Sequence, residues 1–123
     1  MLEVEPFCKP NRVKDPNNKN IVEQRHSPVI ESPSEVKSGE FFNVVLRVGE
    51  IEHPNQHGHF IHWIKIYLDD LYLTRTDFTP VMTKPEITLS LKIAQKSQET
   101  LIRAVTRCNQ HGIWESNTLI TVK

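Results

Sequence analysis

Residues 41–48 read Phe-Phe-Asn-Val-Val-Leu-Arg-Val, and their polarity alternates along the segment. Apolar side chains stand at every second position from Phe42 to Val48, with the polar Asn43 and Arg47 among the residues between them. Successive side chains of a β-strand point to opposite faces, so this period of two predicts a strand with one buried face. The segment therefore favours a sheet that covers a core on one side.

The chain on either side of this segment repeats the pattern. Segments with strand character recur at intervals of about eight to twelve residues, as in antiparallel β-sandwiches, and none has the 3.6-residue period of a helix. They are residues 27–31, 60–68, 71–78, 87–93, 100–108 and 117–122, with Asp69-Asp70 as a tight connection between 60–68 and 71–78. We expect an all-β fold, an immunoglobulin-like antiparallel β-sandwich of about seven strands, although a small barrel has the same periodicity.

The first 20 residues differ in composition from the rest of the chain. They are rich in Pro, Asn and Lys, which predicts an irregular N-terminal arm at residues 1–20. Residues 21–123 then form a single domain. Cys8 lies in the arm and is expected to be a plain thiol.

Charge and hydropathy exclude several classes of protein. Fifteen basic and fifteen acidic residues cancel, whereas proteins of nucleic acids or membrane surfaces usually carry a basic excess. No apolar run approaches the roughly 20 residues of a membrane span. The N-terminal sequence Met-Leu-Glu-Val-Glu-Pro lacks the basic and apolar regions of a signal peptide. We therefore expect a cytoplasmic protein that binds neither nucleic acid nor membrane.

Metal-binding side chains gather in three connections between the expected strands. The connections are Glu23-Gln-Arg-His26, His53-Pro-Asn-Gln-His-Gly-His59 and Cys108-Asn-Gln-His-Gly112. Along an extended strand His53 and His59 would lie about 20 Å apart, but Pro54 and Gly58 turn the backbone between them. Loops at one end of a sandwich can converge on one point. The candidate donors are then four imidazoles and a thiolate.

This donor set narrows the choice of metal. Structural zinc sites usually have four ligands, of which several are cysteines, so five candidate donors with one sulfur fit zinc poorly. Blue copper takes two histidines, one cysteine and often a weak axial methionine. Cys108-x-x-His111 with an upstream histidine resembles that plan, but neither Met1 nor Met82 directly follows His111. Four imidazoles can instead surround iron in a plane with the thiolate axial, which leaves the sixth position open. The non-enzymatic alternative is a cupredoxin-like metal-binding or electron-transfer domain.

Three segments also match, in order, three signatures of a known family. They are Gln24-Arg-His-Ser-Pro-Val-Ile-Glu31, His53-Pro54 with His59-Phe-Ile-His-Trp-Ile64, and Cys108-Asn-Gln-His-Gly-Ile-Trp-Glu115. The sequence resembles the superoxide reductase family, that is, neelaredoxin and the iron-binding domain of desulfoferrodoxin. The family's segments read Glu-Lys-His-Val-Pro-Val-Ile-Glu, His-Pro-x4-His-x-Ile-x-Trp-Ile and Cys-Asn-x-His-Gly-x-Trp-Glu.

The resemblance implies one mononuclear non-haem iron per chain that cycles between Fe2+ and Fe3+. The ligands that it implies are four equatorial histidines, His26, His53, His59 and His111, and the axial Cys108. It implies a superoxide reductase, an antioxidant enzyme that reduces superoxide by one electron to hydrogen peroxide with electrons from rubredoxin or a similar carrier. Because family members are commonly dimers or tetramers, it also implies a homo-oligomer.

The chain departs from the family just before the first histidine. The family's Glu-Lys is replaced by Gln24-Arg25. In the family that glutamate can occupy the sixth position of ferric iron, and the lysine guides superoxide. Gln24 has no carboxylate to offer, and Glu23 lies one position out of register. Arg25 keeps the positive charge, so we expect it to act in catalysis by attracting superoxide.

Four further residues near these motifs are expected to have supporting roles. His57 lies between the two loop histidines, where we expect it to be exposed to solvent. His62 falls within an expected strand, so it is packed or supports the site. Trp63 and Trp114 are expected in the core or in the wall of the site.

Overall fold

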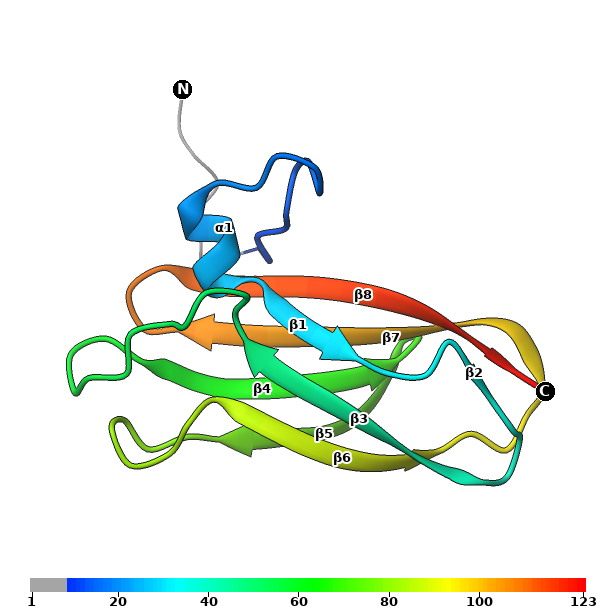
Figure 1. Ribbon diagram of the computed structural model, residues 1–123. Helices are drawn as coiled ribbons and strands as arrows, with labels where there is room; N and C mark the ends of the chain where they lie inside the picture. Colours follow the sequence, from blue (N-terminus) through cyan, green and yellow to red (C-terminus); the bar gives the residue numbers. More distant parts are fainter. Residues whose placement is uncertain (1–8) are drawn as a thin grey trace.

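The computed structural model describes residues 9–123, and within them a short helix precedes eight strands (Figure 1). Helix α1 spans Ile21–His26. The strands are β1 (Pro28–Glu31), β2 (Glu35–Val36), β3 (Phe41–Val48), β4 (Ile61–Leu68), β5 (Leu71–Asp77), β6 (Glu86–Lys92), β7 (Ser97–Cys108) and β8 (Gly112–Val122).

The strands form the two layers of a sandwich (Figure 1). In residues 9–123, one sheet has the order β1-β3-β6 and the other the order β2-β8-β7-β4-β5. Neighbouring strands are antiparallel, apart from β2, which runs parallel to β8. The core lies between the sheets and includes Val44, Leu46, Ile64, Ile66, Ile102, Ala104 and Ile120. The all-β sandwich expected from the sequence is confirmed.

Strand β3 and the β4–β5 connection illustrate how the sequence produces these elements. Val44 and Leu46 are completely buried, while Asn43 faces solvent and accepts a hydrogen bond from Ser90 on β6. At the tight connection, Asp69 adopts a left-handed φ of 50°, which Asp tolerates better than most residues. Its carboxylate also accepts a hydrogen bond from the amide of Leu101 (3.0 Å).

The largest differences from the sequence expectation are in three elements. Residues 21–26 form α1 where a connection was expected, because Asn20 and Glu23 cap a helix too short to show a period. Strand β2 is two residues long and, within residues 9–123, pairs with the end of β8 alone. Strand β8 begins five residues before 117–122, at Gly112. Trp114 and Glu115 are both buried there, so the alternation is lost.

The helix and two connections come together at one end of the sandwich. Figure 1 shows α1, the β3–β4 connection and the β7–β8 turn at this end, opposite the C-terminus. Residues 9–20 pack beside α1 and form a bridge from Asn11 to Trp114. The boundary between arm and domain at residue 20 stays a prediction, and Cys8 lies outside the described residues. No helix in residues 9–123 is long and apolar enough to cross a membrane.

Candidate metal centre

Helix α1 presents His26 from its last turn. A capping box begins the helix, because Asn20 Oδ1 accepts from the amide of Glu23 (2.8 Å) and the Glu23 carboxylate accepts from the amide of Asn20 (3.0 Å). His26 Nδ1 lies 2.7 Å from the carbonyl of Val22. A carbonyl can only accept a hydrogen bond, so Nδ1 carries the proton. Nε2 is then unprotonated, and its lone pair is available to bind a metal.

The β3–β4 connection presses directly on α1. The amide of Ile51 donates to the carbonyl of Gln24 (3.1 Å). A Cβ at Gly49 would lie 2.6 Å from the same carbonyl oxygen and 2.9 Å from the backbone of Arg25. Only glycine permits this close approach. The contact fixes the C-terminal end of α1 against the connection that carries His53 and His59.

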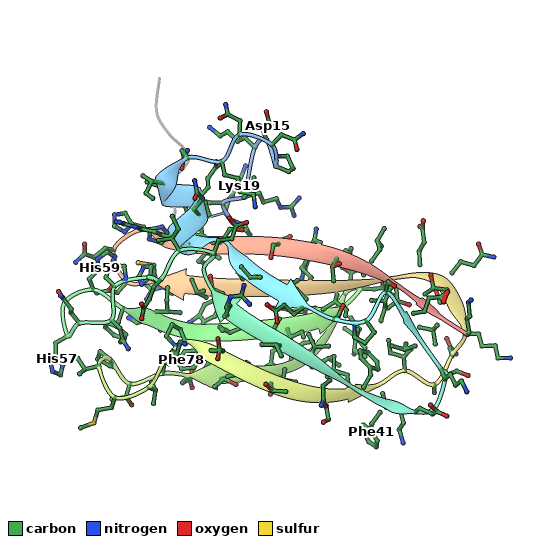
Figure 2. The ribbon with its side chains drawn as sticks, in the orientation of Figure 1. Asp15, Lys19, Phe41, His57, His59 and Phe78 are labelled. Atoms are coloured by element: carbon green, nitrogen blue, oxygen red, sulfur yellow. The ribbon has the colours of Figure 1, made fainter. Side chains whose placement is uncertain are left out.

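The turn within this connection brings His53 and His59 to the same side. The backbone groups of Gln56 and His59 exchange hydrogen bonds of 2.9 and 3.0 Å, which folds residues 53–59 back on themselves. His53 is 2% exposed, and its Nδ1 lies 2.6 Å from the carbonyl of Pro54, which again leaves Nε2 free. Figure 2 shows His59 beside α1 and His57 at the outer tip of the loop. His57 is exposed, as expected.

The β7–β8 turn supplies the thiol and the last imidazole. Cys108 is fully buried at the end of β7, and His111 is exposed in the turn. Gly112 takes a left-handed φ of 90°, which allows the chain to return as β8. Asn109 joins this turn to the β3–β4 connection, because it accepts from the amide of Phe60 and donates to the carbonyl of Gly58, both at 2.9 Å.

These three segments bring the sequence-predicted donors together. One donor atom from each of four residues lies within 4.8 Å of the others: His26, His59, Cys108 and His111. The fifth residue, His53, stands beside them, with its ring centroid 4.7 Å from that of His26 and 4.8 Å from that of His59. The arrangement therefore offers a mononuclear site of imidazole nitrogens and one sulfur.

The buried polar atoms of the cluster fit a metal ion. Nε2 of His26 and Nε2 of His53 are both buried and have no hydrogen-bond partner within residues 9–123. Leaving such groups unpaired costs free energy, and a metal ion would satisfy both. Burial lowers the pKa of His26 and lowers the pKa of His53 from 6.5 to about 4, so both imidazoles are neutral at pH 7. Burial raises the pKa of the Cys108 thiol, so the metal must displace its proton.

The residues that precede His26 have other partners. The Glu23 carboxylate is buried and accepts from the amides of Asn20 and Lys14, and these hydrogen bonds lower its pKa. The Gln24 amide donates to the carbonyl of Lys19 (3.0 Å). Both side chains thus hold residues 14–20. Arg25 is exposed and shares a shallow pocket with His53.

The two tryptophans differ in their relation to the site. Trp114 is 7% exposed and stacks on the His26 ring at a centroid distance of 5.4 Å. Its indole donates to the carbonyl of His111 (3.1 Å), so it forms a wall of the site, as expected. Trp63 is half-buried beneath the ammonium of Lys65, on the sheet surface. His62 is half-buried on β4 and contacts the guanidinium of Arg107, next to Cys108.

Sequence reasoning missed three supports of the site. Asn20 had a local signal, since Asn-x-x-Glu is a capping-box pattern. Asn109 stood inside a signature, but nothing in the pattern said that it ties two loops together. Nothing in the local sequence pointed to Gly49. A side chain is excluded there only because α1 packs directly against its backbone.

A β-sandwich with a histidine–cysteine centre at one end defines a class of mononuclear metalloprotein. The sequence model of the desulfoferrodoxin family matches residues 18–117. The chain is 46% identical over 110 residues to a candidate superoxide reductase of Methanocaldococcus jannaschii. This alignment covers 89% of this chain and 90% of the relative. The chain therefore belongs to the desulfoferrodoxin family.

Solved structures of relatives have the same fold. The superoxide reductase (neelaredoxin) of Ignicoccus hospitalis superposes with a TM-score of 0.73 at 34% identity, covering 80% of this chain and 81% of that one. A candidate superoxide reductase of Thermotoga maritima gives a TM-score of 0.79 at 30% identity and covers 100% of this chain and 99% of its own. These alignments extend the agreement from the signatures to the whole sandwich.

Proposed function

We propose that this protein reduces superoxide to hydrogen peroxide at one mononuclear iron per chain, held by His26, His53, His59, His111 and Cys108. By homology the chain is a superoxide reductase. The observation that supports the ligand set is the cluster of donor atoms of His26, His59, Cys108 and His111 within 4.8 Å. The buried Nε2 atoms of His26 and of the neighbouring His53 have no hydrogen-bond partner in residues 9–123. A histidine–cysteine site in this family implies iron.

Bound iron would alternate between Fe2+ and Fe3+ and pass a single electron to superoxide. The protein's part is to hold that ion with neutral imidazoles and one thiolate, and to leave a side open to a small anion. His111 is exposed and His59 is half-buried, whereas His26, His53 and Cys108 are buried. Solvent and superoxide can therefore approach the cluster from the side of the exposed imidazole, while the buried donors keep water from the opposite side.

Arg25 is our candidate for the residue that attracts superoxide. It lies directly before His26 and shares a surface pocket with His53, and its side chain is exposed. An exposed guanidinium near a site raises the local concentration of an anion by long-range attraction. Glu23 and Gln24 hold residues 14–20 through their hydrogen bonds, so neither is assigned to the sixth position of the iron.

We further propose the partners of the reaction. The electron comes from rubredoxin or a similar one-electron carrier, and the protein works in the cytoplasm as a homodimer or tetramer. In support, superoxide and a small carrier are both diffusible, and the exposed His111 gives a carrier access to the edge of the cluster.

Product analysis tests the reaction class. Protein loaded with Fe2+ and supplied with an excess of reduced rubredoxin is exposed to a steady flux of superoxide. Reduction consumes one superoxide, one electron and two protons for each hydrogen peroxide and releases no oxygen. Dismutation would release one oxygen molecule for every two superoxide ions consumed and would refute the proposal. His57→Ala is the matched control for His59→Ala, because His57 lies in the same loop but faces solvent.

A further inference from the structure

Residues 9–20, which we call the strap, fasten the start of β8. The amide of Asn11 donates to the carbonyl of Ile113 (2.7 Å), and the carbonyl of Asn11 accepts from the amide of Glu115 (2.9 Å). Arg12 forms an ion pair of 2.5 Å with the Glu115 carboxylate, which is 3% exposed. These contacts flank Trp114, the residue that stacks on His26.

The strap also fastens α1 through a second buried carboxylate. Glu23 is 5% exposed and accepts two backbone hydrogen bonds at 3.0 Å, one from Asn20 at the start of the helix and one from Lys14 in the strap. Hydrogen bonds to a charged acceptor are stronger than neutral ones. A single carboxylate therefore ties the strap to the helix that ends in His26.

A third contact reaches the loop that carries the other two histidines. Lys19, which Figure 2 places in the strap above the sandwich, pairs with Glu50 in the β3–β4 connection. Between the strap and the body of the protein lies a cleft of about 420 Å³ lined by Arg12, Lys19, Glu23, Glu50 and Glu115, among others. Apolar residues, among them Val13 of the strap and Val29 of β1, also line this cleft. The contacts of Asn11, Arg12, Lys14 and Lys19 described above are hydrogen bonds and ion pairs that hold the strap beside it.

We propose that the strap is a positioning device for the metal site. Arg12, through Glu115, and Glu23, through Lys14, hold α1 in the position that brings His26 to the other donors, and so set the strength of metal binding. The inference rests on the proposed metal site. It goes beyond that site because it assigns a role to residues 9–20, which contribute no metal ligand.

Helix length explains why α1 needs this support. Isolated helices shorter than about 12 residues are unstable in water, and α1 has six residues. Its order therefore depends on the capping box, the strap and the contact with Gly49. If α1 is detached in some of the metal-free molecules, those molecules lack His26 at the site. The apparent affinity for the metal is then the intrinsic affinity multiplied by the fraction of molecules in which α1 is docked. By linkage, metal binding at His26 must in turn stabilise the docked strap.

Cobalt binding provides a test that does not depend on turnover. Metal-free parent, Arg12→Ala, Arg12→Lys, Glu23→Ala and the control Arg47→Ala are titrated with Co2+ against a chromophoric chelator. Arg47 pairs with Glu31 in the other sheet, so its substitution also removes a surface ion pair. Urea unfolding shows that each variant is folded. Hydrogen exchange of residues 11–26 is followed with and without Co2+.

We expect one Co2+ per parent chain and slower exchange in residues 11–20 on loading. Arg12→Ala and Glu23→Ala should weaken Co2+ binding by about 10-fold, the loss expected when α1 is docked in only about a tenth of the metal-free molecules. Arg12→Lys should recover part of the loss, and Arg47→Ala should match the parent. Parent affinity in both alanine variants, or strap exchange unchanged by Co2+, would overturn the role of the strap. A parent that binds no Co2+ would instead overturn the metal site itself.

Discussion

Lowering the pH from 7 to 5 should destabilise the metal-free protein, with His53 as a main cause. The side chain is 2% exposed, and burial lowers its pKa from 6.5 to about 4. Between these two values the unfolded chain binds a proton at His53 and the folded chain does not. The free energy of unfolding therefore falls as the pH falls through this window, and the stabilisation is fully present only above pH 6.5.

The size of the effect follows from the two pKa values of His53. One pKa unit is about 1.4 kcal/mol, so the full window between 6.5 and about 4 is worth about 3 kcal/mol. About 2 kcal/mol of this falls between pH 7 and 5. Burial also lowers the pKa of His26 and of His59, so both act in the same direction.

Urea unfolding at pH 7, 6 and 5 in the presence of a chelator measures this loss. We expect the parent to lose at least about 2 kcal/mol and His53→Leu to lose clearly less, because it keeps only the other buried imidazoles. His57→Ala, in the same loop but exposed, should keep the parent's slope. A parent whose stability is flat between pH 7 and 5 would show that His53 is not buried as a neutral imidazole, and the reasoning would fail.

The remaining predictions concern the thiol, the exposed guanidinium and the glycine beneath α1. Cys108→Ser loaded with Fe3+ should lose the visible sulfur-to-iron charge-transfer band, and a retained band would remove Cys108 from the ligand set. Arg25→Ala should slow the second-order reaction of the Fe2+ protein with superoxide and flatten its salt dependence, because the screening length falls from about 10 Å at 0.1 M to about 3 Å at 1 M. Arg25→Lys should keep both, and an unchanged rate and slope in Arg25→Ala would contradict steering. Gly49→Ala places a Cβ 2.6 Å from the Gln24 carbonyl and should cost about 1–3 kcal/mol of unfolding free energy. At Gly58 a Cβ meets nothing within 4 Å, so equal stabilities of the two alanine variants would contradict the crowding.

The strands could be predicted because each is a local pattern. In residues 41–48 an apolar side chain stands at every second position from Phe42 to Val48, and β3 begins and ends at the same residues as this segment. The first half of β8 could not be predicted in this way. Trp114 faces the site, while Glu115 on the opposite face is covered by Arg12, so two successive residues are buried. Arg12, which buries Glu115, lies about 100 positions away in the chain. The periodicity of a short segment cannot predict such a distant contact.

The same limit applies to the residues around His26. The spacing and the family signatures singled out the donors, since loops at one end of a sandwich converge. They did not show what Glu23 does, because its role depends on residues 14–20 folding back onto α1. The sequence left Glu23 as a possible sixth ligand, one position out of register. In the structure its carboxylate accepts hydrogen bonds from the backbone amides of Asn20 and Lys14.

Burial acts in opposite directions on the two kinds of buried donor, and it leaves these buried groups uncharged before metal binds. It lowers the pKa of His26 and His53 and raises that of Cys108, so at pH 7 these groups are neutral imidazoles and a protonated thiol. Metal binding must then release the thiol proton, and a divalent ion with one thiolate leaves a net positive charge in a poorly solvated place. The attraction for an anion therefore arises when the metal enters. Arg25, which is exposed and remains charged with or without metal, adds a permanent field at the surface. We propose that the metal centre and the exposed guanidinium both attract superoxide, and that salt screens the contribution of Arg25.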